Sequence, residues 1–229
     1  MNFDSIKEWT DSGMPFNSFV LGDCMEAMRE MPDNFVELCI CDPPYGIGED
    51  GASNHSRGCL AKTTKFIPKE WDREKPNGKY FSELIRVSKN QIIWGGNYFI
   101  DDLNSTPCMI VWDKRNGDND FADCELAWTS FKTAVRKFEW LWAGFWQQNM
   151  KHKDKRIHPT QKPIALYRWI LKNYAQAGWK ILDTHVGSGS SLIACEREGF
   201  DYVGFEIDTD YYKSACKRME RERAQLTLL

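Results

Sequence analysis

One stretch of the chain carries four residues whose groups suit a planar nucleobase, namely Asp42, Pro43, Pro44 and Tyr45. The Asp42 carboxylate and the Pro43 carbonyl can each accept a hydrogen bond from an exocyclic amine, and the Tyr45 ring offers a flat face for stacking. The same residue types are also common in ordinary turns that end a strand. The stretch therefore predicts either a base-binding site or a plain turn, and other parts of the chain must decide between them.

A short strand must position these four residues. Residues 36–41 form an apolar run, and the two prolines stop it because neither can donate a backbone hydrogen bond to a sheet. Ligands bind at the carboxyl ends of strands in open parallel sheets. Asp23 has a similar place after the strand predicted at residues 17–21, where it either faces a ligand or caps the helix that follows.

A turn of small residues near the end of the chain suits a nucleoside. The strand predicted at residues 180–183 ends in Asp183 and runs into residues 184–191, after which a helix is predicted. Such a turn lets the backbone approach a ligand at a helix N-terminus. Glu206 lies in the next predicted strand, residues 202–208, about 20 residues after the turn. At that spacing a carboxylate can hold the hydroxyls of a ribose.

The remaining elements follow from apolar periodicity. It predicts helices over residues 24–31, 80–87, 164–171, 192–198 and 211–225. It predicts further strands at residues 91–94, 109–112 and 125–128, and a half-buried strand where Phe138, Trp140 and Trp142 alternate. Strands that alternate with helices indicate an α/β fold, in which the acids at the strand ends converge on one edge of the sheet.

The composition limits the class of protein. With 229 residues the chain suits a single domain, residues 1–229, and it has no apolar run of the length, about 18 residues, that a membrane span needs. The N-terminus has neither signal nor transit character, so we expect a cytoplasmic protein without a membrane partner. Eight cysteines form no Cys-x-x-Cys pair, which favours buried thiols and the absence of a metal.

Two segments concentrate positive charge in a chain whose net charge is -3. Lys62 and Lys65 lie in a polar, glycine-bearing stretch at about residues 46–70, which we expect to be a mobile loop. A second group, which we call the basic run, consists of Lys151, Lys153, Lys155 and Arg156. Both segments suit the phosphates of DNA, and a solvated loop is the alternative for the basic run.

The order of these motifs resembles the β group of amino-methylating DNA methyltransferases, in which Asp-Pro-Pro-Tyr precedes the cofactor loop. The resemblance runs from Gly22-Asp23 through the segment at residues 158–163 to Glu206 and beyond. It implies a single-domain Rossmann-like fold with circularly permuted motif order, a mostly parallel seven-stranded sheet with one antiparallel strand, and helices on both faces. It also implies a small target-recognition region at about residues 113–157.

The resemblance assigns roles to individual residues. Asp42, Pro43, Pro44 and Tyr45 are the catalytic residues that grip a flipped base. The residues that bind S-adenosylmethionine are Asp23, Cys24, Thr160, Gln161, Lys162, Asp183, His185, Gly187, Ser188, Gly189, Ser190, Glu206 and Ile207. The DNA-binding residues, expected from their positive charge and not from the resemblance, are Lys62, Lys65 and the basic run. The chain departs from the family at Thr184-His185, where Pro-Phe is usual, and His185 is either a packing residue or a base.

The implied reaction is methyl transfer to the N6 amine of adenine in a specific sequence of double-stranded DNA, as in restriction-modification systems, by one chain or a homodimer. Hydrogen bonds from the amine to Asp42 and Pro43 would free the nitrogen lone pair for direct in-line attack on a flipped base. The alternatives are methylation of the N4 amine of cytosine, an RNA substrate, a catalytically silent nucleic-acid-binding paralogue, and a nucleotide-binding regulator. A dinucleotide oxidoreductase is disfavoured because its glycine fingerprint would follow the first strand.

Overall fold

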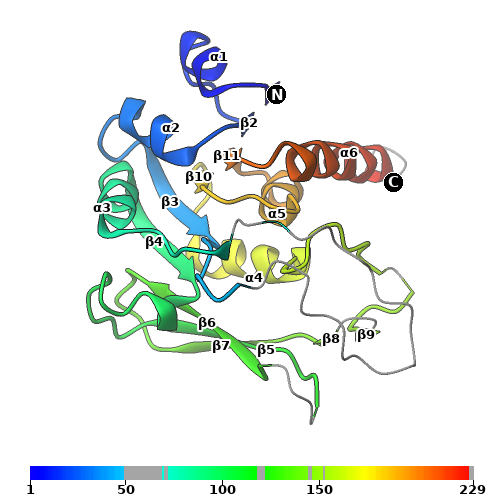
Figure 1. The fold of residues 1–229 in the computed structure, drawn as a ribbon. Helices are drawn as coiled ribbons and strands as arrows, with labels where there is room; N and C mark the ends of the chain where they lie inside the picture. Colours follow the sequence, from blue (N-terminus) through cyan, green and yellow to red (C-terminus); the bar gives the residue numbers. More distant parts are fainter. Residues whose placement is uncertain (49–68, 70–71, 118–121, 144–145, 152, 227–229) are drawn as a thin grey trace.

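In the computed structural model, nine described strands form one sheet in the order β1-β2-β11-β10-β3-β4-β6-β5-β7 (Figure 1). The structure describes residues 1–48, 69, 72–117, 122–143, 146–151 and 153–226. The strands of this sheet are β1 (Asn2–Phe3), β2 (Ser18–Leu21), β3 (Val36–Cys41), β4 (Ser88–Trp94), β5 (Met109–Asp113), β6 (Cys124–Thr129), β7 (Arg136–Glu139), β10 (Lys180–Asp183) and β11 (Asp201–Glu206). A separate hairpin pairs β8 (Trp142–Ala143) with β9 (Trp146–Gln147).

One strand of the sheet runs against the others, as predicted. β6 is antiparallel to both of its neighbours, β4 and β5, and every other described pair in the sheet is parallel. The sheet has nine strands where seven were predicted, because the short segments β1 and β7 extend its two edges. The α/β class and the mostly parallel sheet are therefore confirmed, and the number of strands is corrected.

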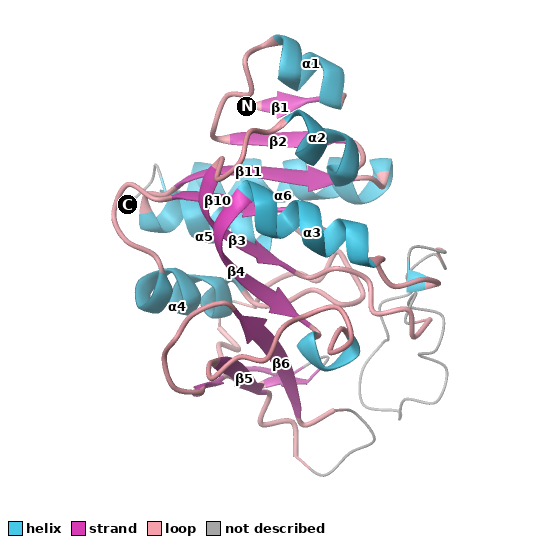
Figure 2. Cartoon of the chain, turned by 90° about the vertical axis from the view of Figure 1, so that its left-hand side faces the viewer, coloured by secondary structure: helices cyan, strands magenta, loops and turns pink. Residues whose placement is uncertain are grey.

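Helices cover both faces of the sheet, because successive strand residues point to opposite sides. They are α1 (Ile6–Asp11), α2 (Cys24–Glu30), α3 (Gly78–Val87), α4 (Ile164–Tyr174), α5 (Ser190–Glu198) and α6 (Thr209–Leu226). Leu38 and Ile40 of β3 pack into a core with α4, α5 and α6, whereas Cys39 and Cys41 pack into a second core with α1, α2 and α3. Figure 2 shows α2 and α3 in front of the sheet and α5 and α6 behind it.

The predicted helices all form, and one unpredicted helix precedes them. Ser5 caps α1 by accepting a hydrogen bond from the Glu8 backbone N–H at 3.1 Å. Ile6 and Trp9 are its two buried side chains. Two apolar anchors in a polar stretch give too weak a period to predict a helix from sequence. Among the described residues, no helix is both long and apolar enough to cross a membrane.

The carboxyl ends of five neighbouring parallel strands meet at one edge of the sheet. Asp23 follows β2, Glu206 ends β11, Asp183 ends β10, Asp42 follows β3, and Gly95 follows β4. This convergence places the predicted base-binding residues beside the predicted nucleoside-binding residues. The predicted mobile loop at residues 46–70, with Lys62 and Lys65, lies for the most part outside the described residues.

Candidate functional site

The turn after β3 is held in place by hydrogen bonds that surround Asp42 and Tyr45. The Tyr45 hydroxyl donates a hydrogen bond to Asp42 Oδ1 at 2.5 Å. The backbone N–H groups of Tyr45 and Gly46 donate to Asp72 Oδ1 at 2.7 and 2.9 Å. Asp72 was not predicted as a site residue, because its contribution depends on a chain segment that returns to the turn from 26 or 27 positions away. These bonds fix the carboxylate and the aromatic ring relative to each other.

The ring of Tyr45 lies against the turn that follows β4. It stacks on Tyr98 with ring centroids 4.8 Å apart and an angle of 15° between the planes. Phe99 meets it edge-on at 6.1 Å. Gly95, with φ of 71°, lies so close to the Tyr45 ring that a side chain there would overlap it. The ring is thus positioned by a glycine-containing turn, and 39% of Tyr98 remains exposed beside it.

Lys162 brings a positive charge into direct contact with Asp42. Its ammonium lies 2.5 Å from Asp42 Oδ2 and 2.9 Å from Glu125 Oε2, and its side chain is 3% exposed. The backbone carbonyl of Lys162 accepts a hydrogen bond from the Ser190 hydroxyl at 2.8 Å. Sequence predicted this lysine at the methionine end of a cofactor. The structure places its backbone beside the glycine turn and its ammonium at the predicted base-binding residues.

Charge pairing keeps Lys162 and Glu125 ionised. Burial alone would lower the pKa of Lys162, but the carboxylates of Asp42 and Glu125 raise it above its ordinary value. Burial would likewise raise the pKa of Glu125, yet Lys162 and Lys114 outweigh it and lower the pKa to about 2. Lys114 contacts the other oxygen of Glu125 at 2.6 Å. Glu125 was predicted only as part of a strand, and its sequence signal is a charged residue beside the apolar residues of β6.

The glycine turn between β10 and α5 lies between two buried carboxylates. Asp183 accepts hydrogen bonds from the Ser191 hydroxyl and from the His185 backbone N–H, the latter at 2.9 Å. Glu206 accepts from the backbone N–H groups of Gly187 and Asp208, both at 2.8 Å. The N-terminus of α5 therefore starts where two acids and a flexible backbone meet, which is a suitable place for a polar ligand.

Both of these acids titrate near neutral pH. Burial raises the pKa of Asp183 to about 7, although hydrogen bonds from Ser191 and His185 act in the opposite direction. Burial also raises the pKa of Glu206 to about 7, against the effect of its backbone donors. A ligand that brings hydroxyl or ammonium groups would stabilise the ionised forms.

Thr184 and His185 pack against α3. The Thr184 hydroxyl lies 2.7 Å from the Tyr80 hydroxyl and 2.9 Å from His185 Nδ1. The His185 ring meets the Tyr80 ring edge-on at 5.5 Å. Burial lowers the pKa of His185 to about 4, so the imidazole is a weak base at neutral pH. This geometry favours packing over base catalysis for His185.

Arg218 of α6 supports the glycine turn from behind. Its Nη1 donates to the Ser188 carbonyl at 2.8 Å and to the Ser190 hydroxyl at 2.9 Å. Its Nη2 lies 3.8 Å from Asp154, which stands within the segment that carries the basic run. The sequence indicated a helix with solvated charges here, whereas Arg218 is buried. It therefore connects the predicted cofactor turn to the predicted DNA-binding segment.

The other residues predicted for the cofactor lie around the same edge. Asp23 caps α2 by accepting from the Met25 N–H at 2.8 Å, and Cys24 is buried behind it. Gln161 is buried and its Oε1 accepts from the Ile157 N–H at 2.9 Å. Ile207 is 65% exposed next to Glu206.

The basic run is mostly exposed. Lys151, Lys153 and Lys155 are exposed, whereas Arg156 is half-buried and donates a hydrogen bond to the Pro159 carbonyl. Arg156 thus has a structural contact that the sequence did not predict.

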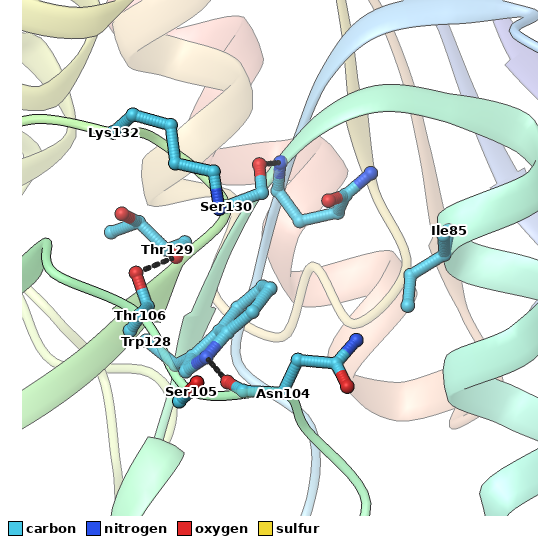
Figure 3. A pocket seen from close by; sticks show the side chains of 9 residues that line it. Ile85, Asn104, Ser105, Thr106, Trp128, Thr129, Ser130 and Lys132 are labelled. Carbon is cyan, nitrogen blue, oxygen red and sulfur yellow. Dashed lines mark hydrogen bonds between the residues drawn. The ribbon is translucent and has the colours of Figure 1, made fainter.

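Two surface hollows lie apart from the residues described above. One, of about 170 Å³, is shown in Figure 3 and is lined by Ile85, Gln91, Asn104, Ser105, Thr106, Trp128, Thr129, Ser130 and Lys132. It contains none of the predicted site residues. The other, of about 420 Å³, lies in the predicted recognition region and is lined by Arg115, Asn116, Gly117, Leu141, Ala143 and Trp146. Trp146 is 63% exposed there.

Comparison by sequence relates the chain to proteins that modify DNA. Residues 111–217 match a family model described as DNA methylase. The Type II methyltransferase M.HpaI of Haemophilus parainfluenzae is 25% identical over 246 residues, which cover 89% of this chain and 74% of that protein. The Type II methyltransferase M.HinfI of Haemophilus influenzae is 22% identical over 248 residues, with coverage of 89% and 68%.

Comparison by structure shows the same fold in solved methyltransferases. The complex of M1.HpyAVI with SAM has a TM-score of 0.53 and 18% identity, and the match covers 87% of this chain and 98% of that one. The PvuII DNA methyltransferase, described as cytosine-N4-specific, has a TM-score of 0.58 and 12% identity, with coverage of 97% and 92%.

Proposed function

We propose that this chain, whose residues 111–217 match a family model described as DNA methylase, transfers a methyl group to the N6 amine of adenine in double-stranded DNA. The donor is S-adenosylmethionine. One observation carries the proposal: the Asp42 carboxylate and the Tyr45 ring lie in one turn, at the same sheet edge as Asp183 and Glu206. An acceptor and a stacking surface for a base thus stand beside acceptors for a nucleoside.

The hydrogen-bond acceptors at the ends of β10 and β11 fit S-adenosylmethionine. Ionised Glu206 can accept hydrogen bonds from ribose hydroxyls, and ionised Asp183 can accept from an ammonium group. Gly187 and Gly189 have φ of 53° and 81°, which allows the turn to present its backbone closely to the ligand. Exposed Ile207 can cover the adenine ring, and Asp23 has a second oxygen available to its amine. When bound there, the cofactor supplies an electrophilic methyl group.

The residues after β3 would activate the amine. The lone pair of an adenine amine is delocalised into the ring, so the nitrogen is a poor nucleophile. Hydrogen bonds from the amine to the Asp42 carboxylate and the Pro43 carbonyl favour a pyramidal nitrogen whose lone pair is free. The face of the Tyr45 ring opposite Tyr98 would stack on the flipped base and replace about 1 to 3 kcal/mol of the stacking that the base loses on leaving the duplex. Catalysis then depends on position and electrostatics, and it needs no covalent intermediate on the protein.

A direct assay distinguishes the adenine proposal from its nearest competitor. Methylation of the cytosine N4 amine needs the same chemistry, and the PvuII DNA methyltransferase, which has a similar fold, is described as cytosine-N4-specific. Asp42 favours adenine, because cytosine enzymes of this type more often begin the turn with serine. Unmethylated bacterial DNA incubated with the protein and S-adenosylmethionine should yield N6-methyladenine on digestion and mass spectrometry. N4-methylcytosine would select the second candidate, methylation of RNA alone would replace DNA as the substrate, and no methylated base would refute methyl transfer to nucleic acid.

The basic run and the hollow beside Trp146 support a DNA-binding role for residues 113–157. Replacing Lys153 and Lys155 by glutamine should weaken DNA binding uniformly across sequences. The slope of log K against log salt should fall by up to about 0.9 for each phosphate contact removed. Binding to a labelled duplex at several salt concentrations measures this slope.

A matched double variant controls for the loss of two charges. Lys7 and Lys89 are exposed. Lys7 lies on α1, which follows the edge strand β1, and Lys89 lies at the amino end of β4, away from the strand ends that carry Asp42 and Asp183. Their replacement by glutamine should leave the salt slope within experimental error of the original. An equal change in slope for the two double variants would assign the effect to net charge and not to the basic run.

The affinity for S-adenosylmethionine should depend on pH through Glu206 and Asp183. Both carboxyls have a pKa of about 7, because burial disfavours their ionised forms, and only the ionised forms accept from the ligand with both oxygens. Affinity should therefore be full above pH 8 and fall as pH drops below 7. A single group protonated at pH 6 weakens binding about tenfold. Titration calorimetry at pH 8, 7 and 6 tests this.

Glu206→Gln is the matched variant for this dependence. It should bind the cofactor more weakly at pH 8 and show a smaller decrease between pH 8 and pH 6, because one of the two titrating groups is absent. A dissociation constant for the original protein that stays the same from pH 8 to pH 6 would contradict the assignment.

A further inference from the structure

Four buried or half-buried charges of alternating sign form a continuous row that ends at Asp42. Lys114 contacts Glu125 at 2.6 Å, Glu125 contacts Lys162 at 2.9 Å, and Lys162 contacts Asp42 at 2.5 Å. The row joins β6 to the turn after β3 by way of the segment before α4. Asp42 is separated from Lys162 by 120 positions in sequence, so the row is a product of the fold.

The contact with Lys162 creates a difficulty for the proposed reaction. Asp42 receives the Tyr45 hydroxyl on Oδ1 and the Lys162 ammonium on Oδ2. If the Lys162 ammonium were paired with Asp42 alone, it would neutralise the Asp42 carboxylate. The substrate amine gains positive charge as the methyl group is transferred, so it needs a carboxylate whose charge remains effective. A second carboxylate must therefore share the Lys162 ammonium, so that the ammonium does not fully neutralise Asp42.

We propose that Glu125 is a positioning residue for methyl transfer, which shares the Lys162 ammonium with Asp42 so that Asp42 keeps a negative charge for the substrate amine. This inference rests on the proposed function. Asp42 and Lys162 alone form a neutral pair, to which Glu125 adds a negative charge 2.9 Å from the ammonium, whereas the balancing charge of Lys114 lies against the other oxygen of Glu125. Lys114 contacts the far oxygen of Glu125 and fixes the direction in which its near oxygen points.

The surroundings make this sharing effective. The Lys162 side chain is 3% exposed, so water screens its charge weakly and pairwise interactions are stronger than at the surface. The ring of Trp94 lies 5.4 Å from the ammonium and limits the space into which it can move. When a base enters, Lys162 can shift toward Glu125, which it already touches. Asp42 Oδ2 then becomes available to the amine.

Replacing Glu125 by glutamine tests the inference, because the amide has nearly the same shape and lacks the charge. The rate of methyl transfer in a single turnover, with saturating DNA and S-adenosylmethionine, should fall about 10- to 100-fold. The dissociation constant for S-adenosylmethionine should stay within about twofold, since Glu125 is not among the residues proposed to bind the cofactor. Glu125→Asp, which restores the charge at shorter reach, should recover part of the rate, and it also provides a second variant if the glutamine variant is unstable.

The pH profile separates this role from a structural one. Burial raises the pKa of Asp42 and the charge of Glu125 raises it further, whereas Lys162 lowers it. Without Glu125 the acid limb of the single-turnover rate should therefore move to lower pH. Glu198→Gln is the control, because Glu198 pairs with Arg168 at 2.5 Å between α4 and α5. The Glu198→Gln variant should change neither the single-turnover rate nor the pH of its acid limb.

A double-mutant cycle shows whether Glu125 acts through Lys162. In a Lys162→Met background, Glu125→Gln should cost much less than in the original protein. An undiminished cost in that background, or an unchanged rate and pH profile in Glu125→Gln alone, would overturn the inference. If the original protein itself methylates no nucleic acid, the proposed function fails. If it is active and the variant is equally active, only this inference fails.

Discussion

Asp42→Ala is expected to lose methyl transfer by about 100- to 1,000-fold or more while S-adenosylmethionine still binds. The substitution removes the carboxylate that would accept from the substrate amine, and a single preorganised group aimed at developing charge contributes on this scale. The proposed cofactor acids, Asp183 and Glu206, end the separate strands β10 and β11 and keep their own hydrogen-bond donors. Tritiated methyl transfer to DNA measures the first quantity and calorimetry measures the second.

Two companion variants make the Asp42 result specific. Asp33→Ala removes an exposed carboxylate that pairs with Arg86 at 2.9 Å, and it should leave turnover unchanged. Asp42→Asn keeps an acceptor oxygen without the charge, so it should retain more activity than Asp42→Ala and far less than the original. Near-normal turnover by Asp42→Ala, or loss of cofactor binding together with turnover, would contradict the separate roles of the two groups of acids.

The edge of the sheet that carries the acids could be predicted from sequence. Each parallel strand is a short apolar run, and Asp42, Asp183 and Glu206 stand where such a run stops. Parallel strands place their carboxyl ends together, so the positions of these acids follow from topology without knowledge of any side-chain contact. The order of the motifs supplied the permuted arrangement, and the antiparallel strand came from the resemblance.

The contacts that tune the site could not be predicted in this way. Lys162 meets Asp42 and Glu125 only because β6 is inserted between β4 and β5, which brings residues from three distant segments together. Tyr98 reaches Tyr45 through a single turn of 3-10 helix at Gly96–Tyr98, whose direction depends on the φ of Gly95. Local patterns contain no information on such pairings. Sequence therefore predicted the presence of the charges but not the pairs they form.

Arg218 makes a second kind of contact that the sequence could not predict. The C-terminal helix has many charged residues, and a solvated face is the usual explanation of such a composition. Arg218 is nevertheless 7% exposed and donates to the turn at Ser188 and Ser190. Periodicity identifies which side of a helix is apolar. It does not identify a long cation that crosses the apolar side to reach a backbone carbonyl.

Gly95→Ala is expected to reduce methyl transfer about 100-fold with little change in cofactor affinity. A Cβ at this position would lie 2.2 Å from Tyr45 Cε1 and 2.7 Å from Cζ, so the ring must move. The ring cannot move freely, because its hydroxyl is bonded to Asp42 and its face is stacked on Tyr98. A misplacement of about 1 Å in a group that positions the substrate can cost 10²-fold in rate. Single-turnover rates and calorimetry provide the measurements.

Gly199→Ala separates this steric effect from backbone strain. Gly199 has φ of +74° and Gly95 has φ of +71°, so alanine is disfavoured at both positions by a similar amount, of the order of 1 kcal/mol. No atom lies within 4 Å of a Cβ at Gly199, whereas the Tyr45 ring occupies that space at Gly95. Gly199→Ala should therefore lose thermal stability through backbone strain alone and keep its activity, whereas Gly95→Ala should lose at least as much stability and also lose activity. Equal activity in the two would mean that the position of the Tyr45 ring does not control the reaction.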